Sequence, residues 1–121
     1  MLKLTLSLPC PQNRRQRPGF AGGKPFMYLS KECREKRKRL VAEVWKQLGG
    51  KPEPLASAQI TYTIYPATKK DPDIDAYEKE LLDGLAQAGV IVNDRKFLQI
   101  SKEKLGPEYP GRLEVEIWGV E

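Results

Sequence analysis

The stretch AQITYTIY, residues 58–65, carries a β-strand signal in the middle of the chain. Its isoleucines, Ile60 and Ile64, flank Tyr62 and alternate with threonine and tyrosine, residue types that favour strands. Pro66 follows and ends the run, because proline cannot donate a ladder hydrogen bond. The sequence therefore predicts a strand over residues 58–65.

A helical pattern lies on each side of this strand. Before it, apolar residues recur at helical spacing from a cap at Ser30 to a stop at Gly49-Gly50. After it, an apolar stripe runs from Ile74 to Ala88 and closes at Gly89. Both patterns predict amphipathic helices. The polar face of the first helix is basic and carries Lys31, Arg34, Lys36, Lys38 and Arg39.

The outer segments add strands. Leucines alternate with polar residues over 2–8, and apolar residues alternate with glutamates over 111–118. Residues 97–104 predict a further strand, and the apolar run 90–92 predicts a short one. Residues 10–29 are rich in proline and glycine without a sustained period, so they predict a long loop.

The predicted order of elements is β, α, β, α, short β, β, β. Strands interleaved with helices in this way indicate a small mixed sheet with helices packed on it, an α+β fold. A chain of 121 residues suits one hydrophobic core. We therefore expect a single domain over residues 1–121.

Composition excludes several classes of protein. No apolar run approaches the roughly 20 residues of a spanning helix, and the N-terminal alternation lacks the apolar block of a signal peptide. A soluble, cytoplasmic protein with no membrane partner is expected.

The chain has no histidine, which removes Ser-His and Cys-His nucleophiles. Cys10 and Cys33 are expected to be free, buried thiols rather than a disulfide framework or a zinc site.

Charge is distributed unevenly along the chain. Residues 1–70 hold 15 Lys/Arg against 4 Asp/Glu, a surplus of +11, whereas residues 71–121 hold 6 against 12, a balance of −6. A basic surplus of this size indicates a polyanionic partner such as nucleic acid. A solvated basic surface that keeps the protein soluble is the alternative.

The acidic half begins with DPDIDAYEK, residues 71–79. The spacing of Asp71, Asp73 and Asp75 resembles the start of an EF-hand calcium loop. That loop needs glycine at its sixth position and glutamate at its twelfth, where this chain has Ala76 and Leu82. The sequence therefore argues against an EF-hand.

Capping of a helix and binding of a divalent cation both remain open for Asp73 and Asp75, while Asp71 is expected to be a solvated loop residue. Capping accounts for one aspartate, but neighbouring carboxylates repel unless a cation neutralises them. Pro72 favours an extended lead-in, in which Asp73 and Asp75 would face one side.

Lys79 follows Asp75 by four residues and would lie one helical turn along the same face. Two carboxylates beside a lysine suit a hard metal ion and a phosphate. A surface pair between Lys79 and Asp83 is the alternative. Asp94 is a third candidate ligand if residues 90–92 join the sheet, although Asn93-Asp94 alone is also an ordinary turn signal.

These motifs together resemble the RusA family of Holliday junction resolvases. The similarity rests on D-I-D followed by Lys79, on the helix end LLDGLAQAGV and on the VND step. It extends to LSLPCPQNR near the start, to Tyr28-Leu29-Ser30 at the entry to the first helix, to the pair Lys69-Lys70 and to GRLEV in the last strand. The chain departs from many members at Ala76, where they carry asparagine, and at Cys10 in the N-terminal motif.

The resemblance implies a homodimeric, Mg²⁺-dependent endonuclease, with Mn²⁺ as a possible substitute, that nicks DNA four-way junctions symmetrically in recombination and repair. Carried over by position, Asp73, Asp75 and Asp94 match the metal-binding aspartates and Lys79 matches the catalytic lysine. The residues expected to contact DNA are Asn13, Arg14, Arg15, Arg17, Lys69 and Lys70. The alternatives are a non-catalytic nucleic-acid-binding module and a metal-dependent nuclease for another branched DNA.

Overall fold

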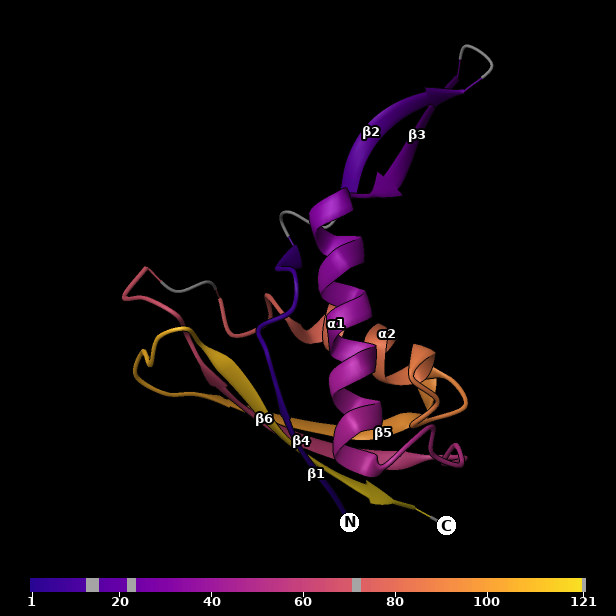
Figure 1. Ribbon diagram of the computed structural model, residues 1–121, viewed down its shortest axis with the longest axis vertical. Helices are drawn as coiled ribbons and strands as arrows, with labels where there is room; N and C mark the ends of the chain where they lie inside the picture. The colour runs from indigo at the N-terminus through magenta and orange to yellow at the C-terminus, as the bar shows by residue number, and fades with distance from the viewer. Residues whose placement is uncertain (13–15, 22–23, 71–72, 121) are drawn as a thin grey trace.

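A four-stranded mixed sheet forms the centre of the molecule (Figure 1). The computed structural model describes residues 1–12, 16–21, 24–70 and 73–120, with the backbone alone for 16–21 and 24–28. The sheet order is β1-β6-β4-β5, in which β4 pairs with β5 in parallel and the other neighbours are antiparallel. The predicted α+β fold is confirmed. The strands are β1 (Leu2–Leu6), β4 (Ala58–Tyr65), β5 (Phe97–Lys104) and β6 (Arg112–Gly119).

Two helices, α1 (Lys31–Leu48) and α2 (Glu78–Gln87), pack on one face of this sheet. The hydroxyl of Ser30 accepts a hydrogen bond from the Cys33 amide, and Gly49 ends α1 at a φ of 78°, as predicted.

Among the described helices, none combines the length and the apolar character needed to span a membrane. The largest buried side chains of the core are Leu6, Leu40, Ile60, Tyr62, Ile64, Leu81, Leu85, Ile91, Leu113 and Ile117.

The predicted short strand at residues 90–92 is reduced to one isolated bridge between Ile91 and Leu55. The Leu55 amide donates to the Val90 carbonyl and the Val92 amide donates to the Leu55 carbonyl. With this bridge in place of the short strand, β1, α1, β4, α2, β5 and β6 follow the predicted order of elements. The bridge thereby anchors the segment that follows α2.

The segment predicted as a long loop contains a β-hairpin, so that prediction was wrong for residues 16–21 and 24–29. Strand β2 (Gln16–Ala21) pairs antiparallel with β3 (Lys24–Leu29). Figure 1 shows the hairpin extending beyond the N-terminal end of α1, away from the four-stranded sheet.

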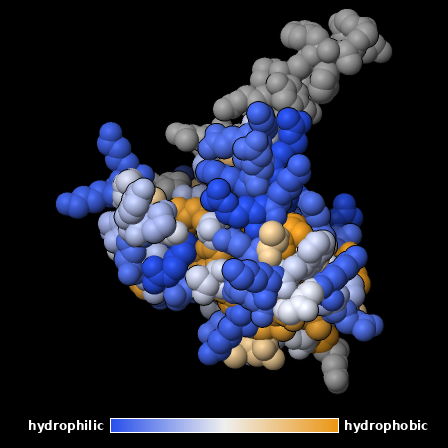
Figure 2. Space-filling model, viewed as in Figure 1, coloured by the Kyte–Doolittle hydropathy of each residue, from blue (hydrophilic) through white to orange (hydrophobic). Residues whose placement is uncertain are grey.

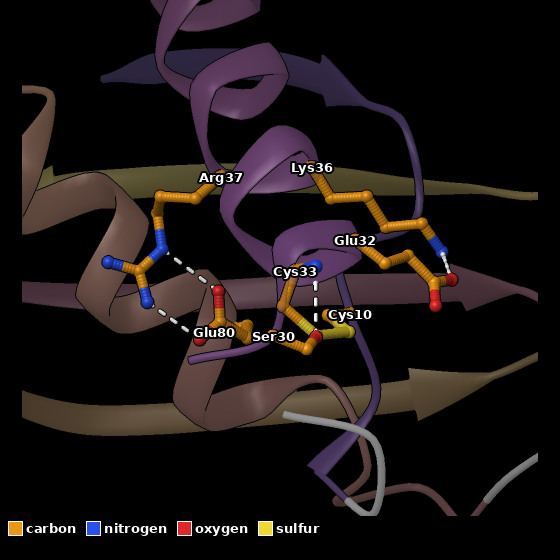
Figure 3. Close-up of a disulfide and its surroundings, with 7 residues drawn as sticks. All are labelled: Cys10, Ser30, Glu32, Cys33, Lys36, Arg37 and Glu80. Carbon is orange, nitrogen blue, oxygen red and sulfur yellow. Dashed lines mark hydrogen bonds and ion pairs between the residues drawn. A yellow bond between two sulfur atoms is a disulfide. The ribbon is translucent and has the colours of Figure 1, made fainter. Parts of the chain in front are cut away.

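A disulfide joins Cys10 to Cys33 at the base of this hairpin (Figure 3). The expectation of two free thiols was therefore wrong. The two Cα atoms lie 5.2 Å apart, within the range that a disulfide spans. The bond ties the segment after β1 to the first turn of α1 and closes a loop that contains the hairpin.

We predict that the Cys10→Ser/Cys33→Ser variant is less stable than the oxidised protein by about 3 kcal/mol, the value expected for a cross-link across a sequence separation of 23 residues. Urea unfolding with and without reductant measures the difference. Thiol titration of the denatured, unreduced protein should detect no free thiol, and detection of two would contradict the disulfide.

Gly111, which precedes β6, has no room for a side chain. Its φ is 90°, and a Cβ there would contact a Leu8 methyl group and lie 2.9 Å from the backbone nitrogen of Ala67. We predict that Gly111→Ala lowers the free energy of unfolding by about 2–3 kcal/mol, because strain and overpacking add. Gly106→Ala is the control, since no atom lies within 4 Å of its Cβ position; equal effects of the two substitutions would contradict the prediction.

Candidate active site

The acidic stretch forms a turn ahead of α2. The Ala76 amide donates to the Asp73 carbonyl at 2.9 Å, and the Glu78 amide donates to the Asp75 carbonyl at 3.3 Å. A turn therefore replaces the extended backbone that was expected from Asp73 to Asp75, while the lead-in at Pro72 lies outside the described residues. Capping by a side chain is also absent at Tyr77, the N-cap of α2. Asp71 lies outside the described residues.

Lys79, in the first turn of α2, bridges the carboxylates of Asp83 and Asp94. Its Nζ lies 3.1 Å from Asp83 and 3.4 Å from Asp94. The hydrogen bond with Asp83 raises the pKa of Lys79 above its ordinary value, so the group is cationic at neutral pH. Since α2 begins at Glu78 rather than near Asp75, the partner one turn along is Asp83. The surface pair considered as an alternative is thus present, and Asp94 joins it.

Asp94 starts a short 3₁₀ helix, η2 (Asp94–Lys96), that follows the bridge at Ile91. The Asn93 side chain accepts a hydrogen bond from the Arg95 amide and fixes this turn beside α2. Burial opposes ionisation of Asp94, but the hydrogen bond and ion pair with the Lys79 ammonium favour it, and the pKa of Asp94 lies below its usual range. Asp94 is therefore an anion next to a fixed cation.

Lys102, on β5, bridges a second pair of carboxylates. Its Nζ is ion-paired with Asp75 and lies 2.7 Å from Glu78. The Tyr62 hydroxyl donates to the same Glu78 oxygen at 3.2 Å. Burial lowers the pKa of Lys102, but hydrogen bonds to Asp75 and Glu78 outweigh this effect and raise it. Burial, with the nearby Glu78 carboxylate, also raises the pKa of Tyr62 well above its usual range, so its hydroxyl remains a donor.

Arg37 on α1 forms a fork of hydrogen bonds with Glu80 on α2 (Figure 3). Its guanidinium makes two hydrogen bonds to Glu80, at 2.6 and 2.9 Å, and lies 3.8 Å from Asp83. It also donates to Gln87 at 3.0 Å. The Glu80 side chain is only 2% exposed, so this fork fixes α2 against α1. Lys79 is thereby linked to the core through Asp83.

The carboxylates have the chemistry that Mg²⁺ prefers, because they are hard oxygen donors. Asp75 and Glu78 already share one cation, the Lys102 ammonium, and Asp83 and Asp94 share another. Over residues 73–120 and the rest of the described chain, no three potential ligands converge on a single metal position. No described contact joins the Asp73 carboxylate to either lysine. The carboxylate pairs therefore offer the oxygen chemistry of a Mg²⁺ site, and in this structure a lysine ammonium lies at each pair.

The predicted DNA-contacting residues are only partly visible. Asn13, Arg14 and Arg15 lie outside the described residues, and only the backbone of Arg17 is described, in β2. The Gln12 amide donates to the Ala76 carbonyl at 2.8 Å, so the chain reaches residue 13 from beside the acidic turn. The last two of the predicted set, Lys69 and Lys70, are exposed after β4.

The basic face predicted for α1 is turned to solvent. Four of its five cationic residues are exposed and the fifth, Lys36, is half-buried. Figure 2 shows hydrophilic side chains over the N-terminal part of α1. A cleft beside this face reaches Tyr77 at the acidic turn, and Lys36 and Arg39 line it. Two residues of the basic face therefore line a cleft that also borders the acidic turn.

The sequence motifs do not point to Lys102 or Glu78. A usable signal exists for Lys102, because it follows Ile100 by two residues and so shares the face of the strand that bears apolar side chains. A lysine at such a position requires an acidic partner.

Comparison with known proteins assigns the chain to a family. The family model described as Endodeoxyribonuclease RusA matches residues 9–118, which include the acidic turn, Lys79, Asp94 and Lys102. No curated protein matches the chain. The match confirms the family suggested by the sequence motifs, and with it the general activity of a nuclease that resolves Holliday junctions. This chain therefore belongs to the RusA family of endodeoxyribonucleases.

Proposed function

We propose that this protein is a Mg²⁺-dependent resolvase that cuts four-way DNA junctions symmetrically, as a homodimer in the cytoplasm, during recombination and repair. The observation that supports it most is the pairing of two lysines with four carboxylates beside α2, within a chain that matches an endodeoxyribonuclease family over residues 9–118.

Asp73, Asp75 and Asp94 would hold the metal ion in this proposal. When bound, Mg²⁺ supplies an activated water and stabilises negative charge on the phosphate oxygens. Mn²⁺, another hard cation, would suit the same oxygens. Asp75 precedes α2 in the sequence and Asp94 follows it, so a metal ion bound by both would also connect the acidic turn to η2.

Lys79 offsets the negative charge that develops on the scissile phosphate. Its side chain is 48% exposed, and its ammonium is oriented by Asp83 and Asp94. Arg37 restrains Asp83 from the α1 side. Asp83, itself held by Arg37, would keep the Lys79 ammonium oriented while Asp94 binds the metal ion.

The DNA backbone would follow the basic face of α1 toward the acidic turn. Phosphate contacts of this kind give affinity that falls with salt but carry little sequence information. Two copies related by a twofold axis present two sites to a substrate that has two opposing strands to cut.

We predict that Lys79→Ala lowers the single-turnover cleavage rate on a junction by about 10²-fold, the usual effect of removing one transition-state charge stabiliser. Binding of the junction should change by less than about threefold. Lys96→Ala, which removes an exposed lysine from neighbouring η2, is the control. A Lys79→Ala enzyme as fast as the Lys96→Ala enzyme would argue against the catalytic role.

The proposal as a whole is tested by presenting a four-way junction, a fork and a linear duplex in Mg²⁺ and measuring binding and cleavage separately. A resolvase cuts the junction fastest by a wide margin. Preferential cutting of the fork would instead indicate a nuclease for another branched DNA. Salt-dependent binding of every branched substrate without cutting would indicate a non-catalytic binding module.

A further inference from the structure

Lys102 occupies the position of a cation inside the acidic site. Its Nζ contacts both Asp75 and Glu78, and its side chain is 23% exposed, whereas that of Asp75 is 74% exposed. The ammonium is thus the more enclosed partner, with the carboxylate of Asp75 above it on the solvent side. Two carboxylates around one cation resemble part of a metal coordination shell.

The fold determines this position of Lys102. In the parallel ladder, Lys102 is the register partner of Tyr62, whose side chain is buried on the face that packs against the helices. Lys102 therefore points toward α2 rather than toward the open face of the sheet. Tyr62 also donates to Glu78, which holds that carboxylate in reach of the lysine.

Lys102 and a divalent ion would use the same oxygens. A metal bound by Asp75 needs a carboxylate oxygen directed at it, and the Asp75 oxygen Oδ1 is now directed at the ammonium. A dication and an ammonium within one coordination sphere repel each other strongly in a partly buried site. Binding of the ion must therefore move Lys102 away from Asp75.

We infer that Lys102 is an internal counter-ion that neutralises Asp75 and Glu78 until a divalent cation displaces it, so that Lys102 lowers the affinity of this site for the metal. The inference rests on the proposed function, because it takes Asp75 as a metal ligand. It adds two residues to the site, Lys102 as the competing cation and Glu78 as a carboxylate that the displaced lysine leaves available.

The test is direct binding of Mn²⁺ to the full-length protein without DNA, with free Mn²⁺ quantified by electron paramagnetic resonance. Lys102→Gln removes the competing charge, and Lys102→Arg keeps it. Lys3→Gln is the matched control, because Lys3 is an exposed lysine on β1, the strand at the opposite edge of the sheet. Asp75→Asn reports whether the bound ion uses the proposed site. Circular dichroism establishes that each variant is folded.

We expect Lys102→Gln to bind Mn²⁺ at least about tenfold more tightly than the wild type, the equivalent of one charge-assisted hydrogen bond. Lys102→Arg should bind no more tightly than the wild type, and Lys3→Gln should change the affinity by less than about threefold, since its charge is distant and screened. Binding that appears only in Lys102→Gln would also support the inference.

If Lys102→Gln bound Mn²⁺ with an affinity within threefold of that of Lys3→Gln, the inference would be overturned. If Asp75→Asn still weakened binding in that case, the proposed metal site would stand and only the competition would be wrong. If Asp75→Asn had no effect, or if neither the wild type nor Lys102→Gln bound Mn²⁺, the metal site itself would be refuted together with the inference.

Discussion

Asp75→Asn is expected to lower the rate of junction cleavage by at least about 10³-fold while junction binding persists. The substitution keeps the shape of the side chain but removes the charge that a metal ion requires. A bound metal contributes several kcal/mol of transition-state stabilisation, and each roughly 1.4 kcal/mol is a tenfold change in rate. Single-turnover cleavage and a gel-shift assay measure the two quantities separately.

Glu103→Gln is the matched control for Asp75→Asn. Glu103 is an exposed carboxylate on β5, and as the neighbour of Lys102 its side chain leaves the strand on the opposite face. The control should cleave at the wild-type rate. Equal rates for Asp75→Asn and Glu103→Gln would remove Asp75 from the active site.

Arg37→Ala is expected to lower the free energy of unfolding by about 3–5 kcal/mol, the usual cost of removing one partner of a buried ion pair. The partner is Glu80, which is 2% exposed and accepts both hydrogen bonds of the guanidinium fork. Loss of Arg37 also removes a cation beside Asp83. Urea unfolding monitored by circular dichroism gives the change.

Two further variants separate the ion pair from a general effect of charge. Arg34→Ala removes an exposed arginine one turn earlier on α1 and should change stability by no more than about 0.5 kcal/mol. Arg37→Met/Glu80→Leu replaces both partners by apolar side chains and should recover most of the loss. A single variant Arg37→Ala as stable as Arg34→Ala would show that the buried pair contributes nothing.

Local chemistry made much of the fold predictable. The Ser30 cap and the Gly49 stop bounded α1, and the alternation around Tyr62 bounded β4, because these signals depend on neighbouring residues alone. The hairpin was missed since Pro18, Gly19 and Pro25 weaken the strand pattern, whereas pairing between β2 and β3 supplies the ladder. The disulfide was missed because sequence does not reveal that Cys10 and Cys33 lie close together.

The site was predictable only in part, for a related reason. Asp75, Lys79 and Asp94 were recognisable from their motif, but the expected contact between Asp75 and Lys79 depended on where α2 begins. The helix begins three residues later than Asp75, and the partner of Asp75 is instead Lys102, from a strand 27 residues further along the chain. That contact follows from the parallel register of β4 and β5, which no local pattern encodes.

Resolvase activity is tested by mapping the nicks that the wild-type protein makes in a four-way junction labelled in turn on each strand, with Mg²⁺ or with EDTA. We predict paired nicks at symmetric positions in two opposing strands, present with Mg²⁺ and absent with EDTA. A junction that is bound but left intact in Mg²⁺ would contradict it.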